Sequence, residues 1–336
     1  MQNSFSDNDA NRVWQEAASL FFHGCGKPQG SRIGDTIELQ HVSFNINNPR
    51  QRWIYARQPA VNPAFAIVEL FVIMSGSNEA KVLNYWNPAL PKYSGNSDEY
   101  YGAYGFRLRK QFGFDQIERA YHVLLNNPDS RQVVLQIWDP RTDMPLSDGQ
   151  PRSEDIPCNI CSMLKVRDGK LDWLQIMRSN DFYRGTPYNI VQFTSIQEIL
   201  AGWLDLEPGK YCLVCDSLHI YKKDLQEIVF SQNELSEYVE NTDSLSISKN
   251  SWDSVLKNVI DNLNLMINPE FKRNQLKKVY NSQSLPYGYK NLLCIVAADC
   301  ARRHGWLAEM DDAVLSCSNN LLKKMWNNWY IRNIQK

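Results

Sequence analysis

Residues 156–189 read IPCNICSMLKVRDGKLDWLQIMRSNDFYRGTPYN, and this stretch decides the fold. Two apolar runs, Cys158–Val166 and Leu171–Met177, flank Arg167–Lys170, whose Asp-Gly pair is a strong hairpin signal. Helical spacing follows over Pro187–Leu204, with proline in the first turn. The segment therefore predicts two hairpin strands followed by a helix.

Helical and extended patterns alternate on both sides of this segment. Apolar spacing predicts helices over Asn11–Phe22, Ala64–Met74 and Asp115–Leu125, and from Trp252 onward. Extended patterns predict strands over Gln132–Trp138 and Tyr211–Tyr221, and a turn into extended chain over 31–46. The mixture indicates an α+β fold, with a large mixed β-sheet flanked by helices.

The region after the last predicted strand changes in composition. Residues 231–251 are rich in Ser, Asn and acidic side chains, and we expect a surface loop or linker there. We therefore divide the chain into a main domain, residues 1–250, and a helical C-terminal extension, residues 251–336, packed on it.

Composition narrows the classes of partner. The 336 residues carry a formal net charge of −1, so no global field favours nucleic acid or an anionic membrane. No apolar run approaches the ~20 residues that span a bilayer. The polar N-terminus does not resemble a signal peptide. These features predict a cytoplasmic protein without nucleic-acid or membrane partners, whose cysteines are thiols.

Cys158 is the candidate nucleophile because of the polar groups that follow it. Arg178-Ser179-Asn180-Asp181 ends the predicted hairpin, Gly185-Thr186-Pro187-Tyr188-Asn189 opens the next helix, and His219-Ile220-Tyr221 ends the following strand. Such groups would be costly as a buried, unpaired set. They predict a polar pocket around the cysteine.

The chemistry of a pyrimidine ring suits this set. Carbon C5 is weakly nucleophilic, and a thiolate that adds at C6 turns the ring into an enolate with carbanion character at C5. Arg178 can lower the pKa of the thiol and hold a phosphate with Ser179. The amide of Asn189 can accept from N3–H of uracil and donate to O4. Because that amide can also flip, cytosine stays an alternative.

Glu69 stands inside the apolar helix predicted over Ala64–Met74. A carboxylate there is costly unless it has a role or a partner.

A zinc site is the alternative role for the cysteines, because Cys158/Cys161 and Cys212/Cys215 form two CxxC pairs. Positions i and i+3 of a strand point to opposite faces, which disfavours joint ligation. We therefore expect no metal.

Together these motifs resemble the thymidylate synthase family. Arg32-Ile33-Gly34-Asp35-Thr36 resembles its phosphate-binding loop, and Gly102-Ala103-Tyr104-Gly105 resembles its Tyr-Gly element. Pro128-Asp129-Ser130-Arg131 and the runs around Cys158, Arg178, Asn189 and His219 follow in the family's order. The resemblance covers roughly residues 12 to 225 and implies a thymidylate synthase-like fold, with residues 1–250 as its catalytic domain.

The resemblance implies roles for individual residues. Cys158 is the implied nucleophile, Glu69 organises proton transfers through water, and Tyr104 helps to remove the C5 proton, with Arg178 and Asn189 completing the catalytic set. The implied binding residues for a pyrimidine nucleoside monophosphate are Arg32, Arg131, Arg178 and Ser179 at the phosphate, Asn189 at the base, and His219 and Tyr221 at the sugar hydroxyl. Arg131 would come from the other subunit of a homodimer.

The implied cosubstrate is 5,10-methylenetetrahydrofolate, which supplies a one-carbon unit and then hydride, giving dTMP and dihydrofolate. Asp181, Gly185 and Trp86 are its implied contacts.

Four departures bear on the product. Asn159 replaces the usual histidine, Gln132 a usual phosphate-binding arginine, and Arg184 an apolar residue near folate. The chain also continues to Lys336 where the family has a short apolar tail. We therefore expect methylation of dUMP, with 5-hydroxymethylation of dUMP, dCMP or CMP as the alternative and an inactive nucleotide-binding homologue as a third reading. Nothing in the sequence distinguishes deoxyribose from ribose.

Overall fold

The computed structural model describes residues 3–228, 238–282 and 284–334. The strands are β1 (Ser4–Asp7), β2 (Lys27–Gln29), β3 (Thr36–Ile46), β4 (Val134–Gln136), β5 (Asn159–Arg167), β6 (Lys170–Asp181) and β7 (Glu207–Tyr221). The helices before β7 are α1 (Ala10–Phe22), α2 (Pro63–Ser75), α3 (Ala80–Trp86), α4 (Pro91–Ser94), α5 (Tyr104–Phe106), η1 (Arg107–Gln111), α6 (Gln116–Asn126), α7 (Pro140–Asp143) and α8 (Thr186–Trp203). Those after it are η2 (Lys222–Asp224), α10 (Lys249–Met266), η3 (Arg273–Gln275), α11 (Leu276–Tyr280), α12 (Tyr287–Arg303), α13 (Leu307–Ser316) and α14 (Asn320–Ile334).

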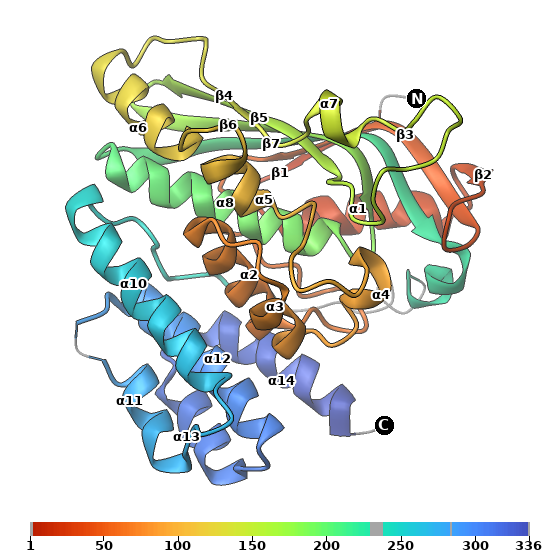
Figure 1. The fold of residues 1–336 in the computed structure, drawn as a ribbon. Coiled ribbons are helices and arrows are strands. Elements are labelled where there is room, and N and C mark those ends of the chain that lie inside the picture. The colour runs from red at the N-terminus through yellow and green to blue at the C-terminus, as the bar shows by residue number, and fades with distance from the viewer. Residues whose placement is uncertain (1–2, 229–237, 283, 335–336) are drawn as a thin grey trace.

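One mixed sheet organises the fold. Its strand order is β1-β3-β7-β6-β5-β4, with β2 paired to β3. The pairs β1–β3 and β6–β7 are parallel, and the other pairs are antiparallel. Helix α8 lies against one face of the sheet, α2 packs on α8, and the C-terminal helices lie beyond α2 (Figure 1). The predicted α+β class is confirmed.

The hairpin that decides the fold forms as predicted. Asp168 and Gly169 connect β5 to β6 with φ values of 49° and 70°. Positive φ at both positions is what a two-residue type I′ hairpin turn requires. Strand β6 then leads through α8 to β7, its parallel neighbour, so α8 is the crossover that covers the sheet.

Helix α2 is delimited by the residues that predicted it. The side chain of Asn62 caps its first turn by accepting from the backbone N–H of Phe65, and Gly76 ends it at φ 69°. Apolar side chains cover almost its whole circumference, because it lies between α8 and the C-terminal helices.

Glu198 lies at the centre of the buried face of α8. Its side chain is fully buried and is paired with Arg50 at 2.8 Å and with Arg52. It also accepts hydrogen bonds from the Ser244 hydroxyl at 2.9 Å and the Leu245 backbone N–H at 3.1 Å. Burial raises the pKa of Glu198, but the two arginines outweigh it and hold that pKa below its usual range.

Residues 238–248 correct the prediction of a surface loop over 231–251. Asn241, Leu245 and Ile247 are buried, because this segment passes between α8 and the C-terminal helices. The Asn319 side chain donates to Asn241 at 2.7 Å, and Gln51 bonds the Asn241 backbone. Residues 231–237 lie outside the described residues. The polar composition did not indicate solvent exposure here, because buried polar groups can hydrogen-bond to one another.

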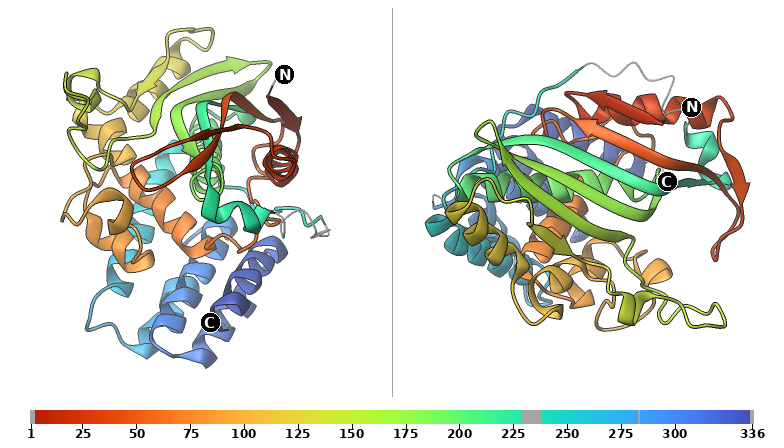
Figure 2. Two further views of the ribbon diagram at one scale, coloured as in Figure 1. Left: turned by 90° about the vertical axis from the view of Figure 1, so that its right-hand side faces the viewer. Right: turned by 90° about the horizontal axis from the view of Figure 1, so that it is seen from above.

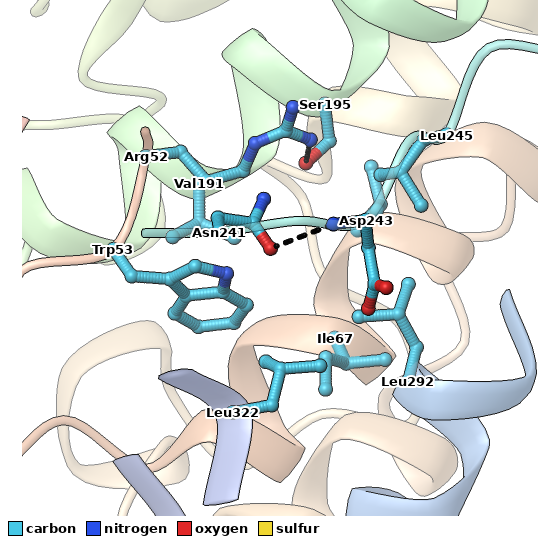
Figure 3. Close-up of a pocket in the computed structure, with 11 residues that line it drawn as sticks. Arg52, Trp53, Ile67, Val191, Ser195, Asn241, Asp243, Leu245, Leu292 and Leu322 are labelled. Carbon is cyan, nitrogen blue, oxygen red and sulfur yellow. Dashed lines mark hydrogen bonds between the residues drawn. The ribbon is translucent and has the colours of Figure 1, made fainter. Parts of the chain in front are cut away.

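A small cavity lies beside this segment (Figure 3). Its volume is about 20 Å³, the size of one water molecule, and Arg52, Asn241 and Asp243 contribute polar groups to its wall. It is therefore too small to bind a substrate.

The C-terminal region is helical, as predicted. Helices α10, α12 and α14 all contact α2, so their apolar faces continue the core of the sheet region. A domain boundary at residue 250 stays a prediction. Within the described ranges, no helix has the length and apolar character needed to cross a bilayer.

Candidate active site

The predicted site residues converge at one end of the sheet. Strands β6 and β7 run parallel and β5 runs antiparallel to β6, so the end of β6, the end of β7 and the start of β5 meet. Asn159 is in register with Met177, and Asp181 with His219. Cys158 therefore lies beside the polar end of β6, and the end of β7 is next along the sheet.

Arg178 holds the turn that carries Cys158. Its Nε donates to the Pro157 carbonyl at 3.0 Å, and its Nη2 donates to the Ile156 carbonyl at 3.1 Å. Its backbone N–H donates to the Cys158 carbonyl at 3.0 Å. A guanidinium has five N–H donors, so others can bind an anion.

The pKa of the Cys158 thiol is raised, although the sequence led us to expect that Arg178 would lower it. Burial raises the pKa of the thiol, and the Arg178 charge offsets only part of this. The carboxyl groups of Asp155 and Asp181 raise that pKa further. The expected lowering by Arg178 is present, but the enclosed position and two acidic neighbours outweigh it.

Tyr104 reaches the cysteine because of a glycine. A Cβ at Gly105 would lie 2.3 Å from the Ile73 carbonyl oxygen, so only glycine lets α5 pack this closely on α2. Burial raises the pKa of Tyr104, the Cys158 thiol raises it further, and a hydrogen bond with Asn159 lowers it. The phenol is therefore neutral and adjacent to the nucleophile.

Glu69 extends from α2 into the same cluster. Its carboxyl is enclosed, and its Oε2 has no hydrogen-bond partner among the described residues. Burial raises the pKa of Glu69 to about 7, against the opposing effect of a hydrogen bond with Gln192. A carboxyl with this pKa can hold and release a proton near neutral pH.

A chain of amide side chains, here called the amide relay, ends at Asn189. The Trp173 indole N–H donates to Gln175 Oε1 at 3.0 Å, and Gln175 Nε2 donates to Asn159 Oδ1 at 2.8 Å. Asn159 Nδ2 donates to Asn189 Oδ1 at 3.3 Å. Asn189 Nδ2 then donates to the Gly185 carbonyl at 3.1 Å.

The two ends of the amide relay fix its direction. An indole N–H can only donate and a backbone carbonyl can only accept, so the amides of Gln175 and Asn189 each have one favourable orientation. The second N–H of Asn189 donates to Asn180 Oδ1 at 3.3 Å. Asn189 Oδ1 accepts only one bond within the relay, which leaves it an acceptor for a ligand.

Asp181 and His219 face each other across β6 and β7. Asp181 Oδ1 accepts from the backbone N–H groups of Tyr183 at 2.9 Å and Arg184 at 2.8 Å. Burial raises the pKa of Asp181 and lowers the pKa of His219, and each group opposes that shift in the other. The Ser179 hydroxyl lies 3.4 Å from His219 Nδ1.

Comparison with known proteins identifies the family of the chain. The profile of the family described as thymidylate synthase matches residues 29–276.

The chain belongs to the thymidylate synthase family.

Three relatives illustrate the range of named activities. The deoxyuridylate hydroxymethyltransferase of Bacillus phage SP01 is 33% identical over 208 residues, which are 59% of this chain and 52% of the relative. That of Pseudomonas phage M6 is 30% identical over 206 residues, 60% of this chain and 57% of the relative. The thymidylate synthase of Clostridium beijerinckii is 31% identical over 191 residues, 56% of this chain and 69% of the relative. The match thus spans about half of each phage relative.

Arg184, a departure from the thymidylate synthase pattern, is paired. Its Nε and Nη2 donate to the two carboxylate oxygens of Asp224 at 3.0 and 2.9 Å. Its guanidinium lies 5.6 Å from the ring centres of Tyr93 and Tyr221. Tyr93 also accepts, through its backbone carbonyl, a 3.2 Å hydrogen bond from Nη2 of the exposed Arg32.

Two expected residues lie away from this cluster. Trp86 is 1% exposed and packs beside Arg303 of α12, so direct contact with folate would require α3 to move. Arg131 is exposed beyond β4, whose Val134 pairs with Met163, five residues along the chain from Cys158. The roles of both residues stay predictions.

Tyr93, Asp155 and Gln175 belong to the site although sequence reasoning did not select them. Asp155 accepts from the Gly102 backbone N–H at 2.7 Å and so holds the turn before Tyr104. Its position three residues before Cys158 was the available signal. Tyr93 had no such signal, because its contacts with Arg32 and Arg184 are distant in sequence.

The cysteine pairs have a different environment from a zinc centre. Strand β6 separates Cys161 on β5 from Cys212 and Cys215 on β7. In the described part of the chain, no group of three or more His, Cys, Asp or Glu side chains could hold a metal ion.

Glu69 gives a testable pH dependence. Its folded pKa of about 7 exceeds the ordinary 4.5, so the folded state holds this proton more tightly than the unfolded state. The stabilisation of the folded state by this proton is fully present below pH ~4.5 and is lost as pH rises through about 7. We expect Glu69→Gln to gain stability over wild type across this range, by at most ~3 kcal/mol, in urea unfolding at each pH. The exposed control Glu270→Gln should run parallel to wild type, and parallel curves for Glu69→Gln would contradict the assignment.

Proposed function

We propose that this protein is an enzyme that transfers the one-carbon unit of 5,10-methylenetetrahydrofolate to C5 of dUMP, after Cys158 adds to C6. The observation that carries the proposal is the amide relay, which orients Asn189 beside Cys158. If N3 of the base lies at Asn189, uracil offers an N–H to the free lone pair of Oδ1. Cytosine presents an acceptor at N3 and would oppose that oxygen.

The nucleotide phosphate would lie between Arg32 and Arg178, with the Ser179 hydroxyl beside them. The two cations come from the loop before β3 and the end of β6, so an anion at this position would join them. His219 and Tyr221 at the end of β7 would bond the sugar hydroxyl. Their rings are 5.7 Å apart and nearly perpendicular, which leaves both polar ends at the strand terminus.

The protonation states of Cys158, Tyr104 and Glu69 support addition of the thiol to a uracil ring. Cys158 is held as a thiol in the free protein, so nucleotide binding must favour the thiolate as negative charge moves onto O4 of the ring. Glu69, with a pKa of about 7, would donate a proton as that charge develops, and the neutral Tyr104 phenol would donate a hydrogen bond. Glu69 can then take up a proton during the loss of the C5 hydrogen.

The folate would supply the one-carbon unit and, for methylation, a hydride. Asp181 suits a pterin, because its Oδ1 is fixed by two backbone N–H groups while burial raises its pKa. Gly185 lacks a Cβ that would lie 2.9 Å from Asn180 Oδ1, so we assign it to shaping the site around Asn189.

Between the two products, we favour 5-hydroxymethyl-dUMP. The phage relatives named as deoxyuridylate hydroxymethyltransferases match 59–60% of this chain. The paired Arg184 and Asp224 also make the folate side polar, which suits admission of water. Methylation to dTMP, the expectation from sequence, is the second candidate and is favoured by the thymidylate synthase relative.

Incubation with dUMP and 5,10-methylenetetrahydrofolate tests both the reaction and its product. We expect tetrahydrofolate and 5-hydroxymethyl-dUMP by mass spectrometry, whereas dihydrofolate absorbance would indicate dTMP. Cys158→Ala should lower turnover at least ~10³-fold and keep nucleotide binding by calorimetry. No turnover with dUMP, dCMP, UMP or CMP despite nucleotide binding would support the inactive-homologue reading.

The amide relay predicts a change in base selection. Gln175→Leu removes the donor that orients Asn159 and so weakens the constraint on Asn189, whose reversal is then opposed by the Gly185 carbonyl and Asn180. We expect the ratio of kcat/KM for dCMP to that for dUMP to rise about tenfold, the equivalent of one hydrogen bond. Ser162→Ala removes the other donor to Gln175 but leaves Trp173, so its ratio should stay unchanged. An unchanged ratio in folded Gln175→Leu would rule out this role.

We also propose a homodimer that joins the open faces of two sheets. Side chains on the face opposite α8 are partly exposed and mostly apolar: Val134, Met163, Leu174, Ile176 and Val214, and Figure 2 shows the strands uncovered from that side. Arg131 lies about 25 Å along the strands from its own Cys158, beyond the reach of its side chain. It could bind a phosphate only in the partner's site.

Mixed dimers test this arrangement. Arg131→Ala and Cys158→Ala each inactivate homodimers if Arg131 acts across the interface. Mixing the two under exchanging conditions should restore activity, because one site then has both wild-type residues. Arg32→Ala mixed with Cys158→Ala should not complement, because the proposed site takes both residues from the same subunit. Subunits that carry both Arg178→Ala and Cys158→Ala should still rescue Arg131→Ala, because one site then keeps every wild-type residue. Absence of rescue in the first mixture, with dimers present by sedimentation, would exclude donation of Arg131.

A further inference from the structure

Helix α12 of the C-terminal region contains a fully buried acid, Asp299. Its two carboxylate oxygens accept separately from Arg302 Nε at 2.8 Å and Arg303 Nε at 2.9 Å. Removal of either partner would leave part of a buried charge uncompensated. Asp299 therefore fixes the direction of both arginines.

The two arginines contact different parts of the molecule. Arg302 stays within the C-terminal region, where its guanidinium lies 5.0 Å from the ring centre of Trp329. Arg303 reaches α3, where its Nη2 donates to the Trp86 carbonyl at 2.8 Å. Its guanidinium also lies 5.2 Å from the ring centre of Tyr85 and 5.6 Å from that of Trp86.

Helix α3 depends on such outside contacts. It has seven residues, and Glu79 makes no side-chain hydrogen bond at its N-terminus. So short a helix is unstable alone, and its last carbonyls lack intrahelical donors. A cation that donates to the Trp86 carbonyl satisfies one of them and complements the negative end of the helix.

The chain that leaves α3 leads directly to the candidate site. Asn87 ends the helix, and α4 follows with Tyr93. The backbone carbonyl of Tyr93 accepts from Arg32, and its hydroxyl contacts Arg184. The contacts of Arg303 with Trp86 therefore help to fix the start of the segment that places Tyr93 beside these two arginines.

We propose that Asp299 and Arg303 are positioning residues for the active site, acting through α3 and α4. The C-terminal helical region would thus support the folate side of the site through Arg303, whose contacts are with α3. This inference rests on the proposed function for its kinetic test. It predicts that loss of Arg303 impairs folate use more than nucleotide binding. Of the proposed nucleotide-binding residues, Arg32 contacts Tyr93, whereas Arg178 and Asn189 are held by contacts around β6 and α8.

Arg303→Ala and Arg302→Ala form a matched pair, since each removes one bond to Asp299 but only Arg303 contacts α3. We expect Arg303→Ala to raise KM for 5,10-methylenetetrahydrofolate about tenfold, and to raise Kd for dUMP by no more than about threefold through the contact of Tyr93 with Arg32. Arg302→Ala should leave that KM within about twofold, and Arg303→Lys should recover part of the loss. Equal KM changes in the two alanine variants, or none in folded Arg303→Ala, would overturn the proposal.

Hydrogen exchange of the full chain separates this proposal from the proposed reaction. Amides of residues 80–94 should exchange faster in Arg303→Ala than in Arg302→Ala, whether or not dUMP is a substrate. If wild type has no turnover but this difference appears, the positioning contact stands and the reaction fails. If residues 80–94 exchange equally in both variants, the positioning proposal fails whatever the turnover.

Discussion

The burial of α8 on all sides is the constraint on which the rest of the structure depends. A helix enclosed in this way can keep polar side chains only if each finds a partner. Gln197 donates to the carbonyls of Leu171, Gly209 and Lys210, and so ties α8 to the start of β6 and β7. Glu198 binds Arg50, Arg52 and residues 244–245. These pairings fix the helix along its axis, and with it the position of Asn189 at its opposite end.

The same rule accounts for the orientation of the Asn189 amide. Asn189 is hydrogen-bonded to other amides. The hydrogen bonds along a row of amides can run in either direction unless the group at one end can only donate or only accept. Trp173 and the Gly185 carbonyl are such groups, at opposite ends of the amide relay. Asn159, which replaces the histidine usual in the thymidylate synthase family, can join the relay because it both donates and accepts. The replacement thus keeps the Asn189 amide, the proposed base-binding group, in one orientation.

The C-terminal region is joined to the sheet region by polar as well as apolar contacts. Asn291 and Asn319 donate to Asp243, and Arg303 donates to Trp86. Buried polar contacts of this kind depend on geometry and so fix relative positions more closely than apolar packing does. These contacts join the C-terminal helices to α3 and to residues 238–248.

Local sequence determined the elements and most of the candidate site. Asp168-Gly169 specified the hairpin turn, Asn62 and Gly76 delimited α2, and the order of motifs around Cys158 indicated the family, because each signal acts within a few residues. Only the tertiary structure decided the raised pKa of Cys158, the pairing of Arg184 with Asp224 and the burial of Asn241. These properties arise from desolvation and from partners distant in the chain. The sequence alone does not show whether a polar side chain is hydrogen-bonded to water or to another buried group.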